Sequence, residues 1–263
     1  MPPAARLAAE GPDVPAPLTR CQPAACTIRG TLMTRLGAHS ARCLALLTIS
    51  VSAWAAQGEI VSVDNWADYP VGAQLLSVPG PWKVYSSMKV FTYPPTVVVD
   101  DGQRALRLKT DHETMAIGRP MHLDVTTIST LTLKWKPLIL PMGGDVREYA
   151  AQRNDQAARV VVWFDASLFT ERRAIGYVWD SSAPVGTIVR QNGPQAERAL
   201  VVVRSGPRGV GAWHRETRNV YQDYQDIFGD EPTSLVLVTL ESHSDDVASE
   251  SAVLFGRIRF EAR

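Results

Sequence analysis

The stretch TLTLKWKP, residues 130–137, decides the fold class of this 263-residue chain. Its apolar and polar residues alternate, so that Leu131, Leu133 and Trp135 share one face of an extended segment and Thr132, Lys134 and Lys136 share the other. A period of two is typical of a β-strand that buries one face. The stretch therefore predicts a strand at the surface of an apolar core.

Similar short apolar runs follow one another along the chain, separated by turn residues. Residues 96–110, TVVVDDGQRALRLKT, hold two runs around an Asp-Gly turn and predict a β-hairpin. Further runs are ARVVVWFD, IGYVW, ALVVVRSG, LVLVTLES and AVLFGRIRF. Roughly ten strands at this spacing predict an all-β domain, a β-sandwich or jelly roll of galactose-binding-like or lectin-like architecture.

Some central runs, VVVWF and LVLVTL among them, are apolar on both faces, so a loop or the one predicted helix is expected to cover the outer face of a sheet. That helix lies within 218–230, where Asn219 and Gln222 form a capping box and Gly229 ends the helix. The glycine-rich segment 205–213 lies between two strand-like runs and is predicted to be a hairpin loop. It lacks the following helix that a phosphate-binding loop needs.

The first 55 residues have the pattern of a leader. From Met33, two arginines precede the apolar run CLALLTISVSAWA, and Ala53-Trp54-Ala55 fits a secretory cleavage site. We therefore expect residues 1–32 to be a non-structured or misassigned extension, 33–55 a Sec-type signal peptide, and 56–263 a single β-sandwich domain in the periplasm or secreted. A core helix or an anchoring helix is the alternative interpretation of 33–55.

Composition narrows the function classes. All three cysteines, Cys21, Cys26 and Cys43, precede the expected cleavage site, so the mature domain would have no disulfide. It would carry 22 basic against 25 acidic residues, which excludes a strongly basic nucleic-acid binder. No membrane span is expected after cleavage.

The best candidate site lies at the start of the run ARVVVWFD. Asp145, Asp155 and Arg159 gather there, and Arg159 and Trp163 fall on the same face of the predicted strand. A helical turn over DQAA would bring Asp155 next to Arg159. An arginine beside a tryptophan suits a sugar ligand, whereas a salt bridge that fastens the 143–156 loop to the sheet is the structural alternative.

Two further groups are candidate ligand-binding residues. Tyr177 and Trp179 flank Val178, so both rings face the same way. The second group surrounds the start of the helix and consists of Trp213, Arg218, Asn219 and Asp223. Asn219 also has a capping role, and Asp223 is placed to reach Arg218 or a ligand.

The acidic segment ESHSDD, residues 241–246, has two interpretations. Its carboxylates suit Ca²⁺, but it lacks EF-hand spacing, and an exposed loop is the alternative. His112, His122 and His214 have no ligand partner at a recognisable spacing, and the sequence predicts no other metal site or cofactor.

The ordered series LTLKWKP, GGDVREYAAQRNDQAARVVVWFD, IGYVWDSSAPVGT, VVVRSG, WHRETRNVYQDYQDIFG and AVLFGRIRF resembles the bacterial family called domain of unknown function 3047, over residues 58–261. The resemblance implies an exported β-domain. Matching positions are Trp135, Lys136, Asp145, Asp155, Arg159, Tyr177, Trp179, Trp213, Arg218, Asn219, Asp223 and Gly229. Departures are Leu133, Asn154, the ESHSDD segment and Arg257, where the family tends to have Trp, Asp, DTDNTG and an acidic residue.

Three functions are consistent with these observations. The first is a non-catalytic binding domain for carbohydrate or another cell-envelope ligand. The second is a glycan-active hydrolase that uses Asp145 and Asp155 as its carboxylate pair. The third is a structural envelope protein whose polar residues only hold the fold together.

Overall fold

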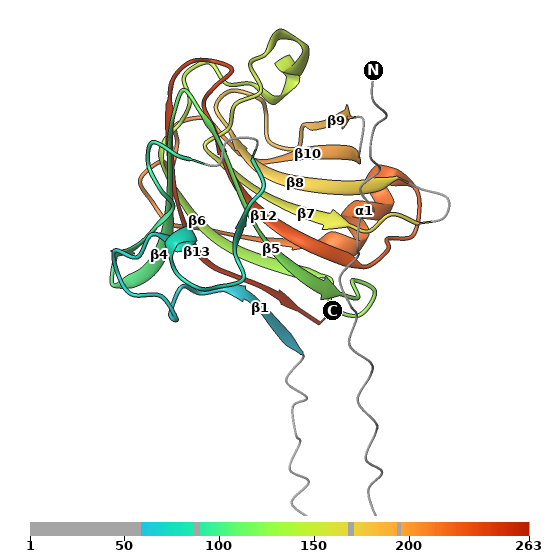
Figure 1. Cartoon of the computed structure of the whole chain (residues 1–263). Helices are drawn as coiled ribbons and strands as arrows, with labels where there is room; N and C mark the ends of the chain where they lie inside the picture. Colours follow the sequence, from blue (N-terminus) through green and yellow to red (C-terminus); the bar gives the residue numbers. More distant parts are fainter. Residues whose placement is uncertain (1–58, 87–89, 168–170, 194–195, 263) are drawn as a thin grey trace, which may run out of the picture. The chain divides into compact units, whose positions relative to one another are not determined.

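Two β-sheets packed face to face form the fold (Figure 1). The structure is a computed structural model that describes residues 59–86, 90–167, 171–193 and 196–262. The chain divides into two units, Met1–Ala53 and Trp54–Arg263, and all described residues belong to the second. The expected extension 1–32 and signal peptide 33–55 lie outside the described residues.

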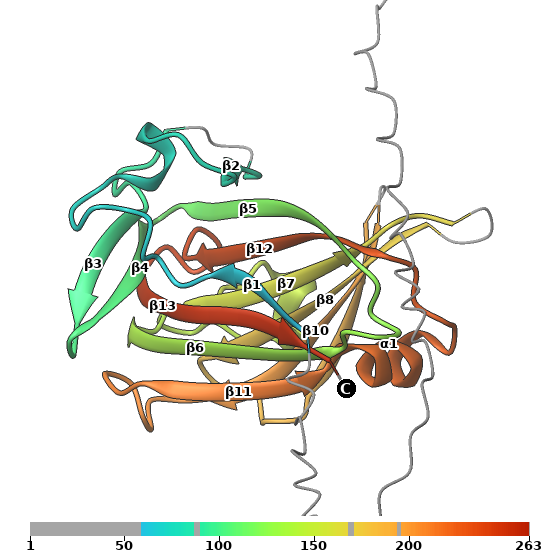
Figure 2. The same ribbon diagram turned by 90° about the horizontal axis from the view of Figure 1, so that it is seen from below.

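Six strands form the first sheet, in the order β11 (His214–Asn219), β6 (Thr130–Ile139), β13 (Glu250–Glu261), β4 (Gln103–Asp111) and β3 (Thr96–Asp100), with β1 (Ile60–Asp64) also paired to β13 (Figure 2). Leu131, Leu133 and Trp135 are fully buried, which confirms the alternation along β6. The hairpin of β3 and β4 is also confirmed. Its turn residues, Asp101 and Gly102, both have positive φ angles, as a two-residue I′ turn requires.

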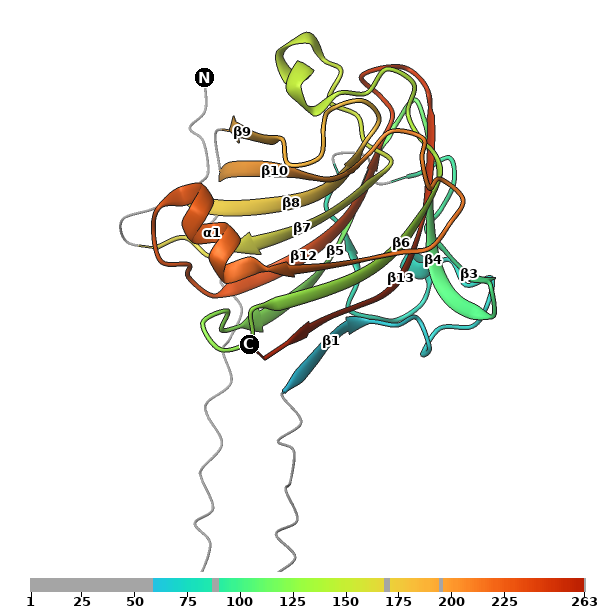
Figure 3. The same cartoon turned by 180° about the vertical axis from the view of Figure 1, so that it is seen from behind.

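Seven strands form the second sheet, in the order β2 (Lys83–Val84), β5 (Thr114–Leu123), β12 (Leu235–His243), β7 (Ala158–Phe164), β8 (Arg172–Asp180), β10 (Ala196–Ser205) and β9 (Ile188–Asn192). Figure 3 shows β9, β10, β8, β7, β12 and β5 side by side in that order. β8 and β10 run parallel, and the other described pairs of this sheet are antiparallel. The predicted β-sandwich class is therefore confirmed.

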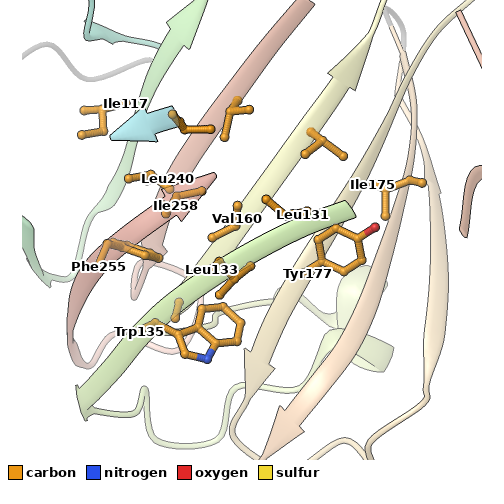
Figure 4. Packing of buried hydrophobic residues seen from close by; sticks show 14 of the residues in the cluster. Ile117, Leu131, Leu133, Trp135, Val160, Ile175, Tyr177, Leu240, Phe255 and Ile258 are labelled. Carbon is orange, nitrogen blue, oxygen red and sulfur yellow. The ribbon is translucent and has the colours of Figure 1, made fainter. Parts of the chain in front are cut away.

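The core lies between the two sheets, where their inner faces meet (Figure 4). The first sheet contributes Leu133 and Phe255, and the second contributes Val160, Ile175 and Leu240, all of them fully buried. Successive residues of a strand point to opposite faces, so the neighbours of these core residues point outward, away from the core.

One α-helix, α1 (Val220–Phe228), follows β11 and lies at one end of the sandwich near β7 and β8 (Figure 3). As predicted, the Asn219 side chain caps it by accepting a hydrogen bond from Gln222 N, and Gly229 ends it with a φ of 76°. Tyr224 enters the main core, its ring 4.7 Å from that of Phe164. The described 3₁₀ helices are η1 (Leu75–Ser77) and η2 (Val146–Ala151).

A loop, not the helix, covers the apolar outer face of β8 and β10. Val178, Leu200 and Val202 point outward and pack against Val146 and Ala183, which lie in the connecting segments beside them. Cover was expected over VVVWF and LVLVTL, which lie in β7 and β12, and it is found instead over the neighbouring β8 and β10. No helix in the described part of the chain is long and apolar enough to cross a membrane.

The prediction for the glycine-rich segment 205–213 is wrong. It joins β10 in the second sheet to β11 in the first, so it crosses between sheets and does not close a hairpin. Gly206, Gly209 and Gly211 adopt positive φ angles along this crossing, and the Gly211 N–H bonds the carbonyl of Pro137. Glycine is suited both to a segment that crosses between sheets and to a hairpin loop, because both require residues with positive φ angles.

Candidate functional site

The outer face of the second sheet carries a cleft of about 650 Å³. Successive side chains of a strand point to opposite faces, so the residues of β7 and β12 that avoid the core line this cleft. They are Arg159 and Trp163 on β7, and Leu237, Thr239, Glu241 and His243 on β12. Neighbouring elements add further residues, among them Tyr85, Tyr149, Arg172, Gln191 and Arg198.

Glu241 lies at the centre of the polar network in the cleft. Its carboxylate is 3.9 Å from the guanidinium groups of both Arg159 and Arg198 and 3.2 Å from His243 Nε2, and it accepts a 2.7 Å hydrogen bond from Thr239. Burial alone would raise the pKa of Glu241, but Arg198, His243 and Arg159 together hold it well below the usual range. The side chain is therefore a buried anion at neutral pH.

Trp163 forms an aromatic surface beside this anion. Its indole Nε1 donates a 3.2 Å hydrogen bond to Thr239, and the guanidinium of Arg198 lies 4.8 Å from the ring centroid. Since Thr239 in turn donates to Glu241, the three side chains form one chain of contacts. Both the orientation of the indole and that of the carboxylate are thus fixed in the absence of a ligand.

Tyr85 adds a second aromatic ring to the cleft, and it is 46% exposed. The ring lies across Gly118 of β5, where a Cβ atom would come within 2.7 Å of it. Glycine at this position therefore makes room for the ring at the surface of the sheet.

Asp155 and Arg159 do not interact as the sequence suggested. Residues 153–156 have no regular structure, so the predicted helical turn over DQAA is wrong. Arg159 is 1% exposed and donates to the backbone carbonyl of Asn154, so the arginine does fasten the 143–156 loop to the sheet, though through a carbonyl. Burial lowers the pKa of Arg159 to about 10, which leaves it charged at neutral pH.

Asp155 is buried in the loop just before β7. Its Oδ2 accepts a 2.8 Å hydrogen bond from Val247 N, whereas its buried Oδ1 has no hydrogen-bond partner. Burial raises the pKa of Asp155 to about 6, and the nearby Asp245 and Asp246 carboxylates add to the rise. The carboxyl group is thus held in an environment that opposes its ionisation.

Asp145 lies outside the residues that line the cleft. It caps η2 and accepts hydrogen bonds from the backbone and guanidinium of Arg147 and from Ser182. The hydrogen bonds from Arg147 lower the pKa of Asp145 to about 2. Asp155 is also absent from the cleft lining, so neither carboxylate of the predicted hydrolase lines the cleft.

Four other predicted residues form contacts elsewhere. Tyr177 faces the core, and its hydroxyl donates a 2.7 Å hydrogen bond to Asp223, which also accepts two hydrogen bonds from Arg218. Burial and the neighbouring Asp223 carboxylate raise the pKa of Tyr177. Asn219 caps α1. None of these side chains lines the cleft.

The remaining two predicted tryptophans also lie apart from the cleft. Trp179 is fully buried on the core side of β8, and its indole donates to the Gly206 carbonyl. Trp213 is the last residue of the crossing segment and donates to Asp100, at the tip of the β3–β4 hairpin. Of the ten predicted site residues, the cleft lining includes Arg159 and Trp163.

The sequence interpretation missed that Thr239, Glu241 and His243 line the cleft together, although it included the last two in the possible Ca²⁺ segment 241–246. They alternate on β12, and this period of two was the available signal. The sequence predicts either a Ca²⁺ loop or an exposed loop over 241–246, but residues 241–243 end a strand, and Glu241 is 3% exposed. The exposed-loop prediction is therefore wrong for its first half. Asp245 and Asp246, which follow, are exposed.

One group of side chains has the composition and spacing of a metal-ion site. Asp155, His243 and Asp245 each place one potential ligand atom within 4.8 Å of the others. The group is formed by the loop before β7 and by the end of β12 with the residues that follow it.

The fold and this cleft define a β-sandwich protein with a polar, partly aromatic cleft on the outer face of one sheet. The family model described as "Protein of unknown function (DUF3047)" matches residues 82–259, and the chain belongs to this family. The resemblance noted in the sequence is thereby confirmed. No curated protein matches the chain.

Several solved structures have a similar arrangement of strands. A cellulase derived from Cel12A of Rhodothermus marinus is 10% identical, with 78% of this chain and 100% of that chain covered and a TM-score of 0.43. The xyloglucanase domain of NopAA from Sinorhizobium fredii is 8% identical, with 71% and 94% covered and a TM-score of 0.40. A family 30 carbohydrate-binding module from Clostridium thermocellum is 12% identical, with 77% and 96% covered and a TM-score of 0.37.

Proposed function

We propose that the cleft on the second sheet binds a carbohydrate of the cell envelope, without catalysis. The observation that carries this proposal is the placement of Trp163 beside Arg198, where its indole donates a hydrogen bond to Thr239, which in turn donates to Glu241. A sugar ring presents an apolar face and a rim of hydroxyl groups. An aromatic ring with fixed donors and acceptors beside it complements both.

The charges of the cleft favour a neutral ligand. Three arginines line it, Arg159, Arg172 and Arg198, but so do three acidic residues, Glu241, Asp245 and Asp246. A cleft that contains both signs creates no strong field of one sign, so a polyanion gains little from it. Hydroxyl groups, in contrast, donate to carboxylates and accept from guanidinium groups.

The proposed location of the protein is the periplasm or the extracellular space. It is supported by the order of positive residues, apolar run and small residues within 33–55. A ligand in the cell envelope is the natural counterpart of such a location. Export is tested separately, by fractionating cells and determining the N-terminus of the mature protein, which is expected at residue 56.

Calorimetric titration with oligosaccharides and envelope glycan fragments tests the binding proposal. We expect one class of sugar to bind, and Trp163→Ala to weaken its affinity by about tenfold or more, equivalent to ~1.4 kcal/mol. Trp213→Ala is the matched control, because Trp213 is also half-buried, also donates its indole N–H to a side chain and also lies near a cationic group, but it lies just before β11 and outside the cleft lining.

The result decides between the functions. Binding that is lost in Trp163→Ala but retained in Trp213→Ala, with cooperative melting of both variants, supports the proposal. A panel in which no sugar binds, or equal affinity in both variants and the wild type, contradicts it. Turnover of a bound glycan would instead point to the hydrolase.

A further inference from the structure

We propose that Asp155, His243 and Asp245 form a binding site for a divalent transition-metal ion, for which Zn²⁺ is the best match. Their potential ligand atoms lie within 4.8 Å of one another, which suits donors that share one ion. The inference is independent of the proposed carbohydrate binding, since it concerns a different group of residues at the margin of the cleft.

His243 makes a carboxylate contact that is common among metal-binding histidines. Its Nε2 lies 3.2 Å from the Glu241 carboxylate and can donate its proton there, which leaves Nδ1 with a free lone pair. Histidine ligands commonly donate their other ring N–H to a carboxylate, and this fixes both the tautomer and the direction of the ring. Glu241, whose carboxylate lies 3.2 Å from His243 Nε2, is placed for this role.

Asp155 supplies a second, independent observation. The residue is 1% exposed, one carboxylate oxygen accepts a hydrogen bond from Val247 N, and the other is buried without a partner. A buried acceptor without a partner is rare in folded proteins, because its desolvation is uncompensated. A cation bound between Asp155, His243 and Asp245 would give the buried Asp155 oxygen a partner.

The adjacent Asn154 shows the same deficit. It is 7% exposed, lines the cleft together with His243 and Asp245, and has a buried side-chain oxygen without a hydrogen-bond partner. Two neighbouring residues, Asn154 and Asp155, thus carry unsatisfied buried oxygens at one place. An amide oxygen is itself an acceptable oxygen ligand or a partner for metal-bound water.

Asp245 completes the group from the more exposed side. Its side chain accepts a hydrogen bond from Thr114 Oγ1, which positions the carboxylate. Because Asp245 and His243 line the cleft, an ion held here would have its open coordination positions toward that side. Three protein ligands with an open position are typical of Zn²⁺ sites that bind water or a further ligand.

The charges around the group are compatible with a cation. The carboxylates of Asp155, Glu241, Asp245 and Asp246 lie near the guanidinium groups of Arg159 and Arg198. A divalent ion bound between Asp155 and Asp245 would offset the repulsion between these two carboxylates.

The donor set decides the class of metal. One imidazole nitrogen with two carboxylates suits Zn²⁺ and its first-row neighbours, whereas Ca²⁺ prefers a shell of oxygen atoms alone. The Ca²⁺ expectation for 241–246 rested on the carboxylates, and His243 makes Zn²⁺ the better match. Calcium is therefore included as a competing ion in the test.

The test is a calorimetric titration of untagged, chelator-treated protein with Zn²⁺, and separately with Ca²⁺. All samples carry Cys21→Ser, Cys26→Ser and Cys43→Ser, because the leader cysteines would otherwise bind zinc. We expect one equivalent of Zn²⁺ per chain, and cobalt substitution should give visible absorption bands that report nitrogen and oxygen coordination.

Three variants distinguish the site from adventitious binding. His243→Asn and Asp155→Asn should each weaken Zn²⁺ affinity by about tenfold or more. His112→Asn is the matched control, because His112 also lies beside a carboxylate, that of Asp111, but is exposed and outside the group. Asp155→Asn replaces an unpaired buried carboxylate by a neutral group of the same shape, so this variant is expected to fold.

Three outcomes would overturn the proposal. They are no Zn²⁺ binding, affinity that is unchanged in both Asp155→Asn and His243→Asn, and Ca²⁺ binding that is tighter than that of Zn²⁺ and insensitive to His243→Asn. Loss of Zn²⁺ binding in the folded Asp155→Asn protein, with His112→Asn unaffected, supports it. Sugar is absent from these titrations, so their result is independent of the carbohydrate experiment.

Discussion

Replacing Glu241 by glutamine tests the central electrostatic contact of the cleft. The substitution keeps the shape of the side chain and the oxygen that accepts from Thr239, but removes the charge. Arg159 is 1% exposed and would lose its carboxylate partner, whereas Arg198 is partly solvated. The main penalty is therefore an uncompensated guanidinium in the interior.

The expected loss of stability follows from that burial. Removing one member of a buried ion pair costs about 3–5 kcal/mol. The 3.9 Å separations and the retained hydrogen bond from Thr239 place Glu241→Gln at the lower end, about 3 kcal/mol. For a domain of this size, that corresponds to a fall in melting temperature of about 6–12 °C.

Urea denaturation at a series of pH values measures this effect. The folded pKa of Glu241 lies below its ordinary value of 4.5, so the stabilisation is fully present above that pH and declines as the pH falls. The difference between wild type and Glu241→Gln should be constant from pH 7 to pH 5. Below pH 4.5 it should shrink by about 1.4 kcal/mol per pH unit.

Glu197→Gln is the matched control, because Glu197 also pairs with two arginines, Arg173 and Arg190. It is more solvated, and Arg190 is largely exposed, so its loss should cost about 1 kcal/mol or less. Equal losses for the two variants, or a difference for Glu241→Gln that does not vary below pH 4.5, would refute the reasoning.

Three further predictions concern residues outside the cleft. Asp145→Asn should destabilise the protein by about 1–2 kcal/mol at pH 7 and by much less at pH 2. The folded pKa of Asp145 is about 2, below its ordinary value of 3.8, so the stabilisation by half-exposed Arg147 is fully present above about pH 4 and is lost as the pH falls through about 2; urea titrations at both pH values check this. Tyr177→Phe should cost about 1–2 kcal/mol in thermal unfolding by removing the hydrogen bond to Asp223, and should leave sugar affinity unchanged. Gly144→Ala should cost about 1–3 kcal/mol in the same assay, because its Cβ would lie 2.2 Å from the backbone carbonyl oxygen of Asp155.

Local patterns in the sequence predicted the fold well. The alternation of β6, the Asp-Gly hairpin between β3 and β4, and the capped helix α1 are all set by residues a few positions apart. The crossing segment 205–213 was mistaken for a hairpin because sheet membership depends on distant partners. Glycines permit either path and specify neither.

In the candidate site as well, local patterns were predicted and contacts between distant segments were not. The shared face of Arg159 and Trp163 follows from the period of a strand and was predicted, and both line the cleft. Tyr177 and Trp179 also share a face, but that face packs in the core. Alternation groups side chains without stating which group is buried, and an aromatic pair fits either environment.

Strand register explains how the residues that were missed come together. In the antiparallel pair of β7 and β12, Glu241 lies directly opposite Arg159, about eighty positions away in the chain. The loop before β7 must then meet the loop after β12 at the same end of the sheet. The His243 N–H indeed donates to the Gln156 carbonyl, and the Asn154 N–H donates to the Asp246 carboxylate. The acidic residues that follow β12 therefore find their partners in the loop that precedes β7. Once the partner of β12 is known, the assembly of Asp155 with the 243–246 segment follows from antiparallel geometry alone.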